Sequence, residues 1–263
     1  MTDGRLGFVA QTHTGDVTPR RAIEQAGELG FDFVELYLDG ASERTRIDLD
    51  ELTALLDERG LDCTVHLPFV DLDLGSPRDL VRDGSVAELE ACLEDAAGLG
   101  AEKAVLHAST HATPPEWDPA TVKPRILDAV HDLDAVGRAV GVEVCVENLP
   151  GVLYSTTEID EVLAETDASL TFDTGHARVD GFDEPDMAAF LRAHADRVSH
   201  VHVNDARVAA DEHVPTGSGT IDFASALEPL REGWDGTYSL EIFTFDFDYL
   251  ALAKSKFEAA MER

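Results

Sequence analysis

The chain has 263 residues, 44% of them hydrophobic, and its formal net charge at pH 7 is −33. The 53 acidic residues against 20 Lys and Arg argue against nucleic acid as a partner, because phosphates attract cationic side chains. Apolar runs fall short of the roughly 18 residues that span a bilayer, and MTDGRLGFVA lacks a charged-then-apolar signal segment, so we expect a cytoplasmic protein with no membrane partner.

The acidic residues are spread along the chain, whereas lysine occurs only at positions 103, 123, 254 and 256. An even acidic coat repels itself in dilute buffer, but at about 1 M salt the Debye length is roughly 3 Å and the repulsion is screened. We therefore hypothesise a halophilic protein. Far-UV circular dichroism is expected to show loss of the fold in dilute buffer and its recovery in concentrated salt. A fold fully retained in dilute buffer would contradict the hypothesis.

Short apolar runs alternate with longer amphipathic runs along the whole chain. The short runs predict strands at 5–11, 32–38, 61–67, 102–108, 142–147, 168–173, 198–203 and 237–243. The longer runs predict helices near 18–29, 48–59, 84–99, 120–140, 156–166, 185–195, 222–232 and 247–261. Eight strand–helix units predict an α/β fold, a closed parallel (β/α)₈ TIM barrel forming a single domain over 1–263. The alternative is an open doubly wound sheet, whose GxGxxG signature is missing after the first strand.

Polar residues recur on one face of seven consecutive predicted strands. Side chains alternate along a strand, so the apolar set faces the helices and the other set faces the barrel axis. The axial set, near the strands' C-terminal ends, is Glu35, His66, His107, Glu147, Asp173, His202 and Glu241. Barrel enzymes build their sites at that end of the strands.

A buried ring of carboxylates and imidazoles needs partners for its charges. A single strand histidine is more often a hydrogen-bonded core residue, but seven strands with the same arrangement favour a bound cation. Carboxylate with imidazole is the ligand mix for Zn²⁺, Mn²⁺, Co²⁺ or Fe²⁺. We interpret His200, one layer deeper, as packing beside a ligand or supporting one. Glu35 is either the neighbour of a ligand or part of an internal salt bridge, and we favour the second.

Two loops add polar residues above the same ring. His176 follows Asp173 by three residues in DTGHA, and Asp211 and His213 form a D-x-H pair after the seventh predicted strand. We expect Glu212 to be exposed and Asp205 to cap its loop. Four more residues are expected either to line the site or to pack its loops, namely His13, Trp117, Phe245 and Phe247.

At these residues the chain resembles a known family, the xylose isomerase-like TIM barrels. The segments that carry the resemblance are HLPF at 66–69, EN at 147–148, DTGHA at 173–177, HVND at 202–205, DEHVPTGSGTIDF at 211–223 and SLEIF at 239–243. The family includes sugar phosphate isomerases and epimerases, and also endonuclease IV. The resemblance runs over nearly the whole chain and is more specific for the superfamily than for one reaction.

The isomerase and epimerase branch implies one divalent ion (Mn, Co, Mg or Zn) held by Glu147, Asp173, His202 and Glu241. The implied reaction is proton transfer beside a carbonyl, with the ion stabilising an enediolate. Glu147 and Glu241 would act as general base and acid from opposite faces of a sugar or other hydroxy-carbonyl substrate. His176 would contact the substrate, as would Arg207, although the spacing of Arg207 is not a clean match. By analogy, such barrels often pair as homo-oligomers.

The endonuclease IV branch implies three zinc ions that cleave a phosphodiester at abasic DNA sites. It uses the same four residues and five more, which correspond here to His66, His107, His176, Asp211 and His213. The family's opening segment after the first strand is missing, since this chain reads LGFVAQTHTG, and HAST stands at 107–110. Basic or aromatic loop segments for bent DNA are also scarce. A third class, a metal-binding barrel without catalysis, is opposed by the intact pair of Glu147 and Glu241. The sequence therefore favours a metal-dependent isomerase or epimerase.

Overall fold

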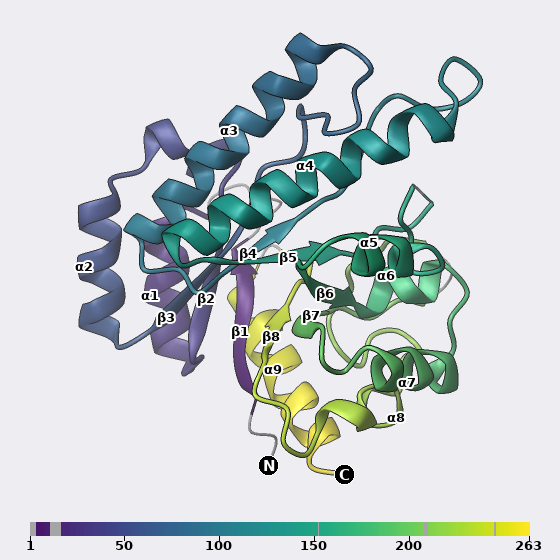
Figure 1. Ribbon diagram of the computed structural model, residues 1–263. Coiled ribbons are helices and arrows are strands. Elements are labelled where there is room, and N and C mark those ends of the chain that lie inside the picture. The colour runs from purple at the N-terminus through teal and green to yellow at the C-terminus, as the bar shows by residue number, and fades with distance from the viewer. Residues whose placement is uncertain (1–3, 11–16, 152, 208–209, 245) are drawn as a thin grey trace.

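Eight parallel strands close into a barrel in chain order, as the sequence predicts (Figure 1). The computed structural model describes residues 4–10, 17–151, 153–207, 210–244 and 246–263. The strands are β1 (Arg5–Ala10), β2 (Phe33–Tyr37), β3 (Asp62–His66), β4 (Lys103–Leu106), β5 (Glu143–Glu147), β6 (Ser169–Asp173), β7 (Val198–Val203) and β8 (Thr237–Leu240). Closure comes from β1 pairing with β8, in a register that joins Arg5 to Thr237 and Phe8 to Leu240.

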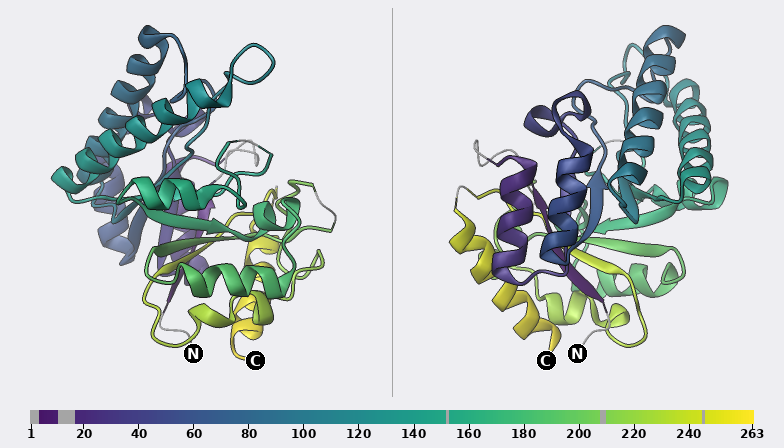
Figure 2. Two further views of the ribbon diagram at one scale, coloured as in Figure 1. Left: turned by 45° about the vertical axis from the view of Figure 1, so that its right-hand side comes forward. Right: turned by 90° about the vertical axis from the view of Figure 1, so that its left-hand side faces the viewer.

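Helices cover the outside of the barrel (Figures 1 and 2). They are α1 (Pro19–Leu29), α2 (Leu49–Arg59), α3 (Asp79–Gly98), α4 (Pro119–Val140), α5 (Ile159–Glu165), α6 (Thr174–Val179), α7 (Glu184–Ala193), α8 (Phe223–Ala226) and α9 (Phe247–Met261). In both figures α3 and α4 lie side by side and extend past the strands. Among the described residues, the structure contains no helix of the length and apolarity that crossing a membrane requires.

Local sequence signals explain where the longer helices begin and end. The Thr18 side chain accepts a hydrogen bond from the Arg21 amide, and Pro19 occupies the first turn of α1. Gly30 ends that helix with φ of 67°, a left-handed conformation that costs glycine little. Asp118 caps α4 in the same way, through the Ala120 amide.

The structure differs from the prediction most clearly at α8, α3, α6 and β8. The helix expected at 222–232 is only α8 followed by a 3₁₀ turn over 228–230, because Pro229 has no N–H to continue an α-helix. Helix α3 begins at Asp79 instead of residue 84, since Gly84 lies within the helix at a cost of only about 1 kcal/mol. The short helix α6 was not predicted. Strand β8 ends at Leu240, yet the Glu241 amide still donates to the Val203 carbonyl.

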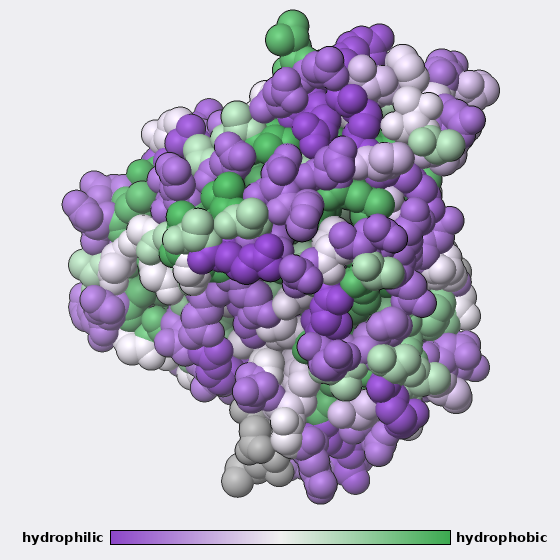
Figure 3. All heavy atoms as spheres, viewed as in Figure 1, coloured by the Kyte–Doolittle hydropathy of each residue, from purple (hydrophilic) through white to green (hydrophobic). Residues whose placement is uncertain are grey.

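The hydrophobic core lies between the sheet and the helices, and the strand faces follow the predicted alternation. Leu36 and Phe172 are buried in this core, whereas Glu35 and Asp173 are fully buried without belonging to it. The visible surface is largely hydrophilic, in keeping with the acidic composition (Figure 3). The barrel therefore carries buried ionisable groups along its axis, and these form the site described next.

Candidate metal centre

Four buried side chains meet at the C-terminal end of the strands. Glu147 and Asp173 are the last residues of β5 and β6, His202 lies on β7, and Glu241 follows β8. Each offers a ligand atom, and these atoms all lie within 4.8 Å of one another. His202 Nδ1 is 3.2 Å from Glu147 Oε1, 3.2 Å from Glu241 Oε2 and 4.0 Å from Asp173 Oδ2. Three carboxylates thus surround one imidazole nitrogen.

Two asparagines and one glycine hold Asp173 in place. The Asp173 side chain accepts two hydrogen bonds, one from the His176 amide at 2.6 Å and one from Asn204 Nδ2 at 2.6 Å. The first of these caps the N-terminus of α6. Asn148 Oδ1 accepts from the Asp173 amide at 2.7 Å. Only glycine fits at position 175, because an added Cβ would overlap the Asn204 side chain. The sequence analysis quoted both asparagines within EN and HVND but assigned them no role.

A second group shares Glu147 with two histidines. His107 Nε2 is 2.9 Å and His66 Nε2 is 3.6 Å from Glu147 Oε2. The other ring nitrogen of His66, Nδ1, lies 2.9 Å from its neighbour's carbonyl, Leu67 O. Phe69 stacks on His107 with ring centroids 3.9 Å apart. This packing limits how either imidazole can turn.

A third group lies above the first, on the loops. Asp211 Oδ1 is 2.7 Å from His213 Nε2 and 3.5 Å from His176 Nε2. The Nδ1 atoms of these histidines point to backbone carbonyls, His176 to Asn148 at 2.9 Å and His213 to Glu241 at 3.2 Å. The structure therefore places in three adjoining groups all nine residues that the resemblance implies as ligands, the four of the isomerase branch and the five further ones of the endonuclease IV branch.

The charges of the first group fit a divalent cation. Burial, together with Glu241 and Glu147, raises the pKa of Asp173 to about 7. Burial alone would lower the pKa of His202, but Glu35, Glu241 and Glu147 raise it well above its usual range. Protons on Asp173 and His202 thus supply positive charge that a bound cation could supply instead. A donor set of three carboxylates and one imidazole suits Mn²⁺, Co²⁺ or Zn²⁺.

Metal affinity is expected to rise with pH. Asp173, with a pKa of about 7, and His202, whose pKa Glu35, Glu241 and Glu147 raise well above its usual range, carry protons that a bound ion must displace. Each displaced proton steepens the dependence by about tenfold in affinity per pH unit below the pKa of its group. Calorimetric titration with Mn²⁺ at pH 6, 7 and 8 and constant salt measures this. An affinity that does not change with pH would contradict the prediction.

A cavity of about 660 Å³ opens above these groups. Glu241, His107, His176 and His213 reach it from below. Its other lining residues are Tyr37, Asp39, Gly40, Phe69, Val70, Ser109, Thr110, His111, Leu149, Pro150, Asp211 and Phe243. None of these lining residues is Lys or Arg. The walls therefore combine apolar and aromatic surface with hydroxyl and carboxylate groups.

Other predicted site residues lie elsewhere. Arg207 does not line this cavity; it is 63% exposed and binds Glu212, with Nη2 2.6 Å from Oε1. The expectation that Glu212 is exposed is wrong, because this ion pair leaves its side chain largely covered. Asp205 caps its loop as predicted, accepting from the amides of Gly217, Gly219 and Ile221.

Of the remaining aromatic and histidine candidates, two pack against other side chains and two lie outside the described residues. Trp117 packs against the core beside Arg78, and Phe247 packs on Phe8. His13 and Phe245 lie outside the described residues. Sequence reasoning missed the cavity walls, which come from loops after different strands.

Residues 23–262 match the family model for the xylose isomerase-like TIM barrel. The chain belongs to this family. A family relative from Methanocaldococcus jannaschii, the uncharacterised protein MJ1311, is 30% identical over 232 residues, which cover 84% of this chain and 78% of that protein. Inosose dehydratase of Yersinia enterocolitica is 27% identical over 177 residues, covering 59% of this chain and 57% of the enzyme. The crystal structure of a D-tagatose 3-epimerase-like protein superposes with a TM-score of 0.85, at 26% identity over 98% of this chain and 97% of that one.

Proposed function

We propose that this protein is a divalent-metal-dependent isomerase or epimerase of a small sugar or related hydroxy-carbonyl compound. The observation that carries the proposal is the arrangement of Glu147 and Glu241 about His202. Their carboxylates come from β5 and from the end of β8 and lie equally far, 3.2 Å, from His202 Nδ1. Asp173 completes the four-residue group. Such a group would hold one divalent ion, with Glu147 and Glu241 among its ligands.

The two glutamates are suited to moving a proton beside a carbonyl. A bound divalent ion supplies the Lewis acid that makes this proton removable. Burial would raise the pKa of Glu241, but His213 and His202 lower it to about 2. His202 and His107 likewise hold the pKa of Glu147 well below its usual range despite burial. Both carboxylates are therefore ionised, as a general base must be. One can remove the proton, and the other, once it has taken up a proton from solvent, can return that proton to the opposite face of the carbon.

The cavity supports a small uncharged substrate. Its volume of about 660 Å³ falls within the range of small-molecule pockets. Tyr37 and Ser109 offer hydroxyls to a polyol, and Phe69 and Phe243 offer apolar faces. Among the described residues that line the cavity there is no Lys or Arg, the side chains that most often pair with a phosphate group. The similarity to proteins named for D-tagatose epimerisation and inosose dehydration is consistent with a polyhydroxylated substrate.

The second candidate is a trinuclear zinc phosphodiesterase acting on abasic DNA. Three adjoining groups of ligand atoms favour it, namely His66, His107 and Glu147; the four residues about His202; and His176, Asp211 and His213. The net charge of −33 and the lining residues of the cavity oppose it, because a DNA backbone requires cationic contacts.

The two candidates are separated by a pair of assays in concentrated salt. Incubation with a panel of ketoses and Mn²⁺ in D₂O is expected to place deuterium on the carbon beside the carbonyl and to form an epimer or isomer, both visible by NMR. A duplex with one abasic site, incubated with Zn²⁺, is expected to stay intact. Cleavage of the duplex without deuterium incorporation would replace the first candidate by the second.

A further inference from the structure

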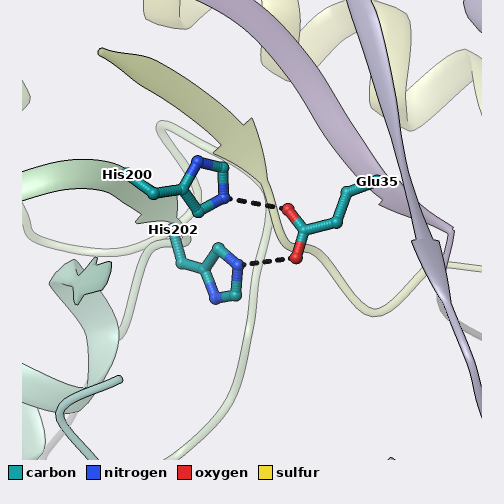
Figure 4. Close-up of side chains that lie close together, drawn as sticks. All are labelled: Glu35, His200 and His202. Carbon is teal, nitrogen blue, oxygen red and sulfur yellow. Dashed lines mark hydrogen bonds and ion pairs between the residues drawn. The ribbon is translucent and has the colours of Figure 1, made fainter. Parts of the chain in front are cut away.

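His202 presents its two ring nitrogens to different partners. Nδ1 faces Glu147, Glu241 and Asp173, whereas Nε2 lies 3.1 Å from Glu35 Oε1. Glu35 reaches this position from β2, across the barrel from β7 (Figure 4). His66, His176 and His213 place Nδ1 against a backbone carbonyl, although His176 Nδ1 also lies 3.2 Å from Glu147 Oε1 and His213 Nδ1 lies 3.3 Å from Glu241 Oε2. In the part of the chain that the structure describes, His202 is the one of these four whose ring nitrogens face carboxylates without a backbone carbonyl.

Glu35 is itself held by a chain of hydrogen bonds along the barrel axis. Its second oxygen, Oε2, lies 2.9 Å from His200 Nε2, as Figure 4 shows. His200 Nδ1 is 2.6 Å from Thr237 Oγ1, and that hydroxyl accepts from Lys103 Nζ at 3.0 Å. All of these side chains are buried.

The direction of this chain follows from which groups can donate. A lysine ammonium only donates, so the Thr237 hydroxyl accepts from Lys103 and turns its own hydrogen to His200 Nδ1. His200 then carries its proton on Nε2 and donates it to Glu35 Oε2. The remaining oxygen of Glu35 accepts the Nε2 proton of His202, so the ring nitrogen that a bound ion would find without a competing Glu35 contact is Nδ1.

We propose that Glu35 is a positioning residue that fixes His202 in the Nε2–H tautomer, so that Nδ1 is the ligand atom for the ion. The inference rests on the metal centre of the proposed function. Glu35, His200 and His202 also form a group that could hold a cation of its own. Their separations of 2.9 and 3.1 Å are those of hydrogen bonds, so each Glu35 oxygen already has a partner. A carboxylate behind a ligating imidazole orients the ring and raises its basicity.

The direct test is the ¹¹³Cd-loaded wild-type protein, observed by cadmium–proton correlation NMR. With Nδ1 as ligand, the cadmium couples to His202 Hε1, three bonds away, but not to Hδ2. Coupling to both protons would show ligation through Nε2 and overturn the inference. This readout needs no variant and no activity, so it remains informative if a variant fails to fold.

The variant Glu35→Gln tests the contribution of the carboxylate. It preserves volume but offers one acceptor and one donor where two imidazole N–H groups need acceptors. We expect Cd²⁺ and Mn²⁺ affinity to fall about 10- to 100-fold. The control is Glu102→Gln, the same change at a glutamate that pairs with Arg5 away from the site, and its affinity is expected to match wild type. Equal affinities in the folded Glu35→Gln variant and wild type, or an equal loss in both variants, would overturn the inference.

Failure of this inference and failure of the proposed function give different results. Ligation through Nδ1 in a protein that moves no proton on any ketose supports the role of Glu35 and contradicts the isomerase. Turnover of a ketose, together with cadmium coupling to Hδ2 of His202, supports the isomerase and contradicts the role of Glu35. A protein that binds no cadmium would overturn both.

Discussion

Glu147→Gln and Glu241→Gln are each expected to lower kcat by about 10³-fold, within the range that general acid–base groups contribute. The amide keeps the shape of each side chain but can neither remove nor return a proton. At least one of the two variants is expected to retain the ion, because the other ligands of the four-residue group remain. Deuterium incorporation and metal content, measured on the same preparation, separate loss of chemistry from loss of metal.

Glu143→Gln is the matched control for these variants. Glu143 lies at the start of β5, four residues before Glu147, and is exposed at the opposite end of the barrel, where it binds Ser169 and Ser199. Its kcat is expected to equal that of wild type. Full activity in either Glu147→Gln or Glu241→Gln would remove the acid–base assignment, whatever the control shows.

Removal of the ion by a chelator is expected to reduce turnover to background and to lower Tm. An ion at about 1,000-fold its Kd stabilises a fold by about 4 kcal/mol, which for a chain of this size corresponds to about 10 °C. Calorimetry before chelation, after chelation and after readdition of Mn²⁺ measures this shift in concentrated salt. The same dialysis without chelator is the control. Turnover that persists in metal-free protein would contradict the prediction.

The number of metal ions per chain can be measured on the same preparations. About one ion per chain in the untreated protein supports the four-residue group. About three zinc ions would show that the groups around His107 and Asp211 are filled as well, and would favour the phosphodiesterase.

The barrel and the ring of ligands could be predicted because both follow from simple periodicities. Alternation along a strand placed Glu147 and His202 on the axial face, and the ends of parallel strands share one rim. Glu35 was placed correctly in an internal ion pair for the same reason. These inferences needed only the strand positions, not the loops.

The cavity walls and the loop partners could not be predicted in this way. Phe69 and Phe243 stack on imidazoles from loops whose paths depend on tertiary contacts. Arg207 was expected at the substrate, but Glu212, five residues further on, provides its ion pair. The break after α8 has a cause in Pro229, which the prediction of a helix over 222–232 did not take into account.

Closure of the barrel by β1 and β8 also constrains the order in which the chain can fold during synthesis. The partners of Arg5 and Phe8 lie at Thr237 and Leu240, so a growing chain exposes the free edge of β1 until residues 237–240 have been synthesised. Glu241, one residue beyond that last pairing, is the last of the four proposed ligands to emerge. An ion that needs all four ligands would therefore bind only after β8 has formed. Until then the nascent chain has an unpaired strand edge that a chaperone can protect.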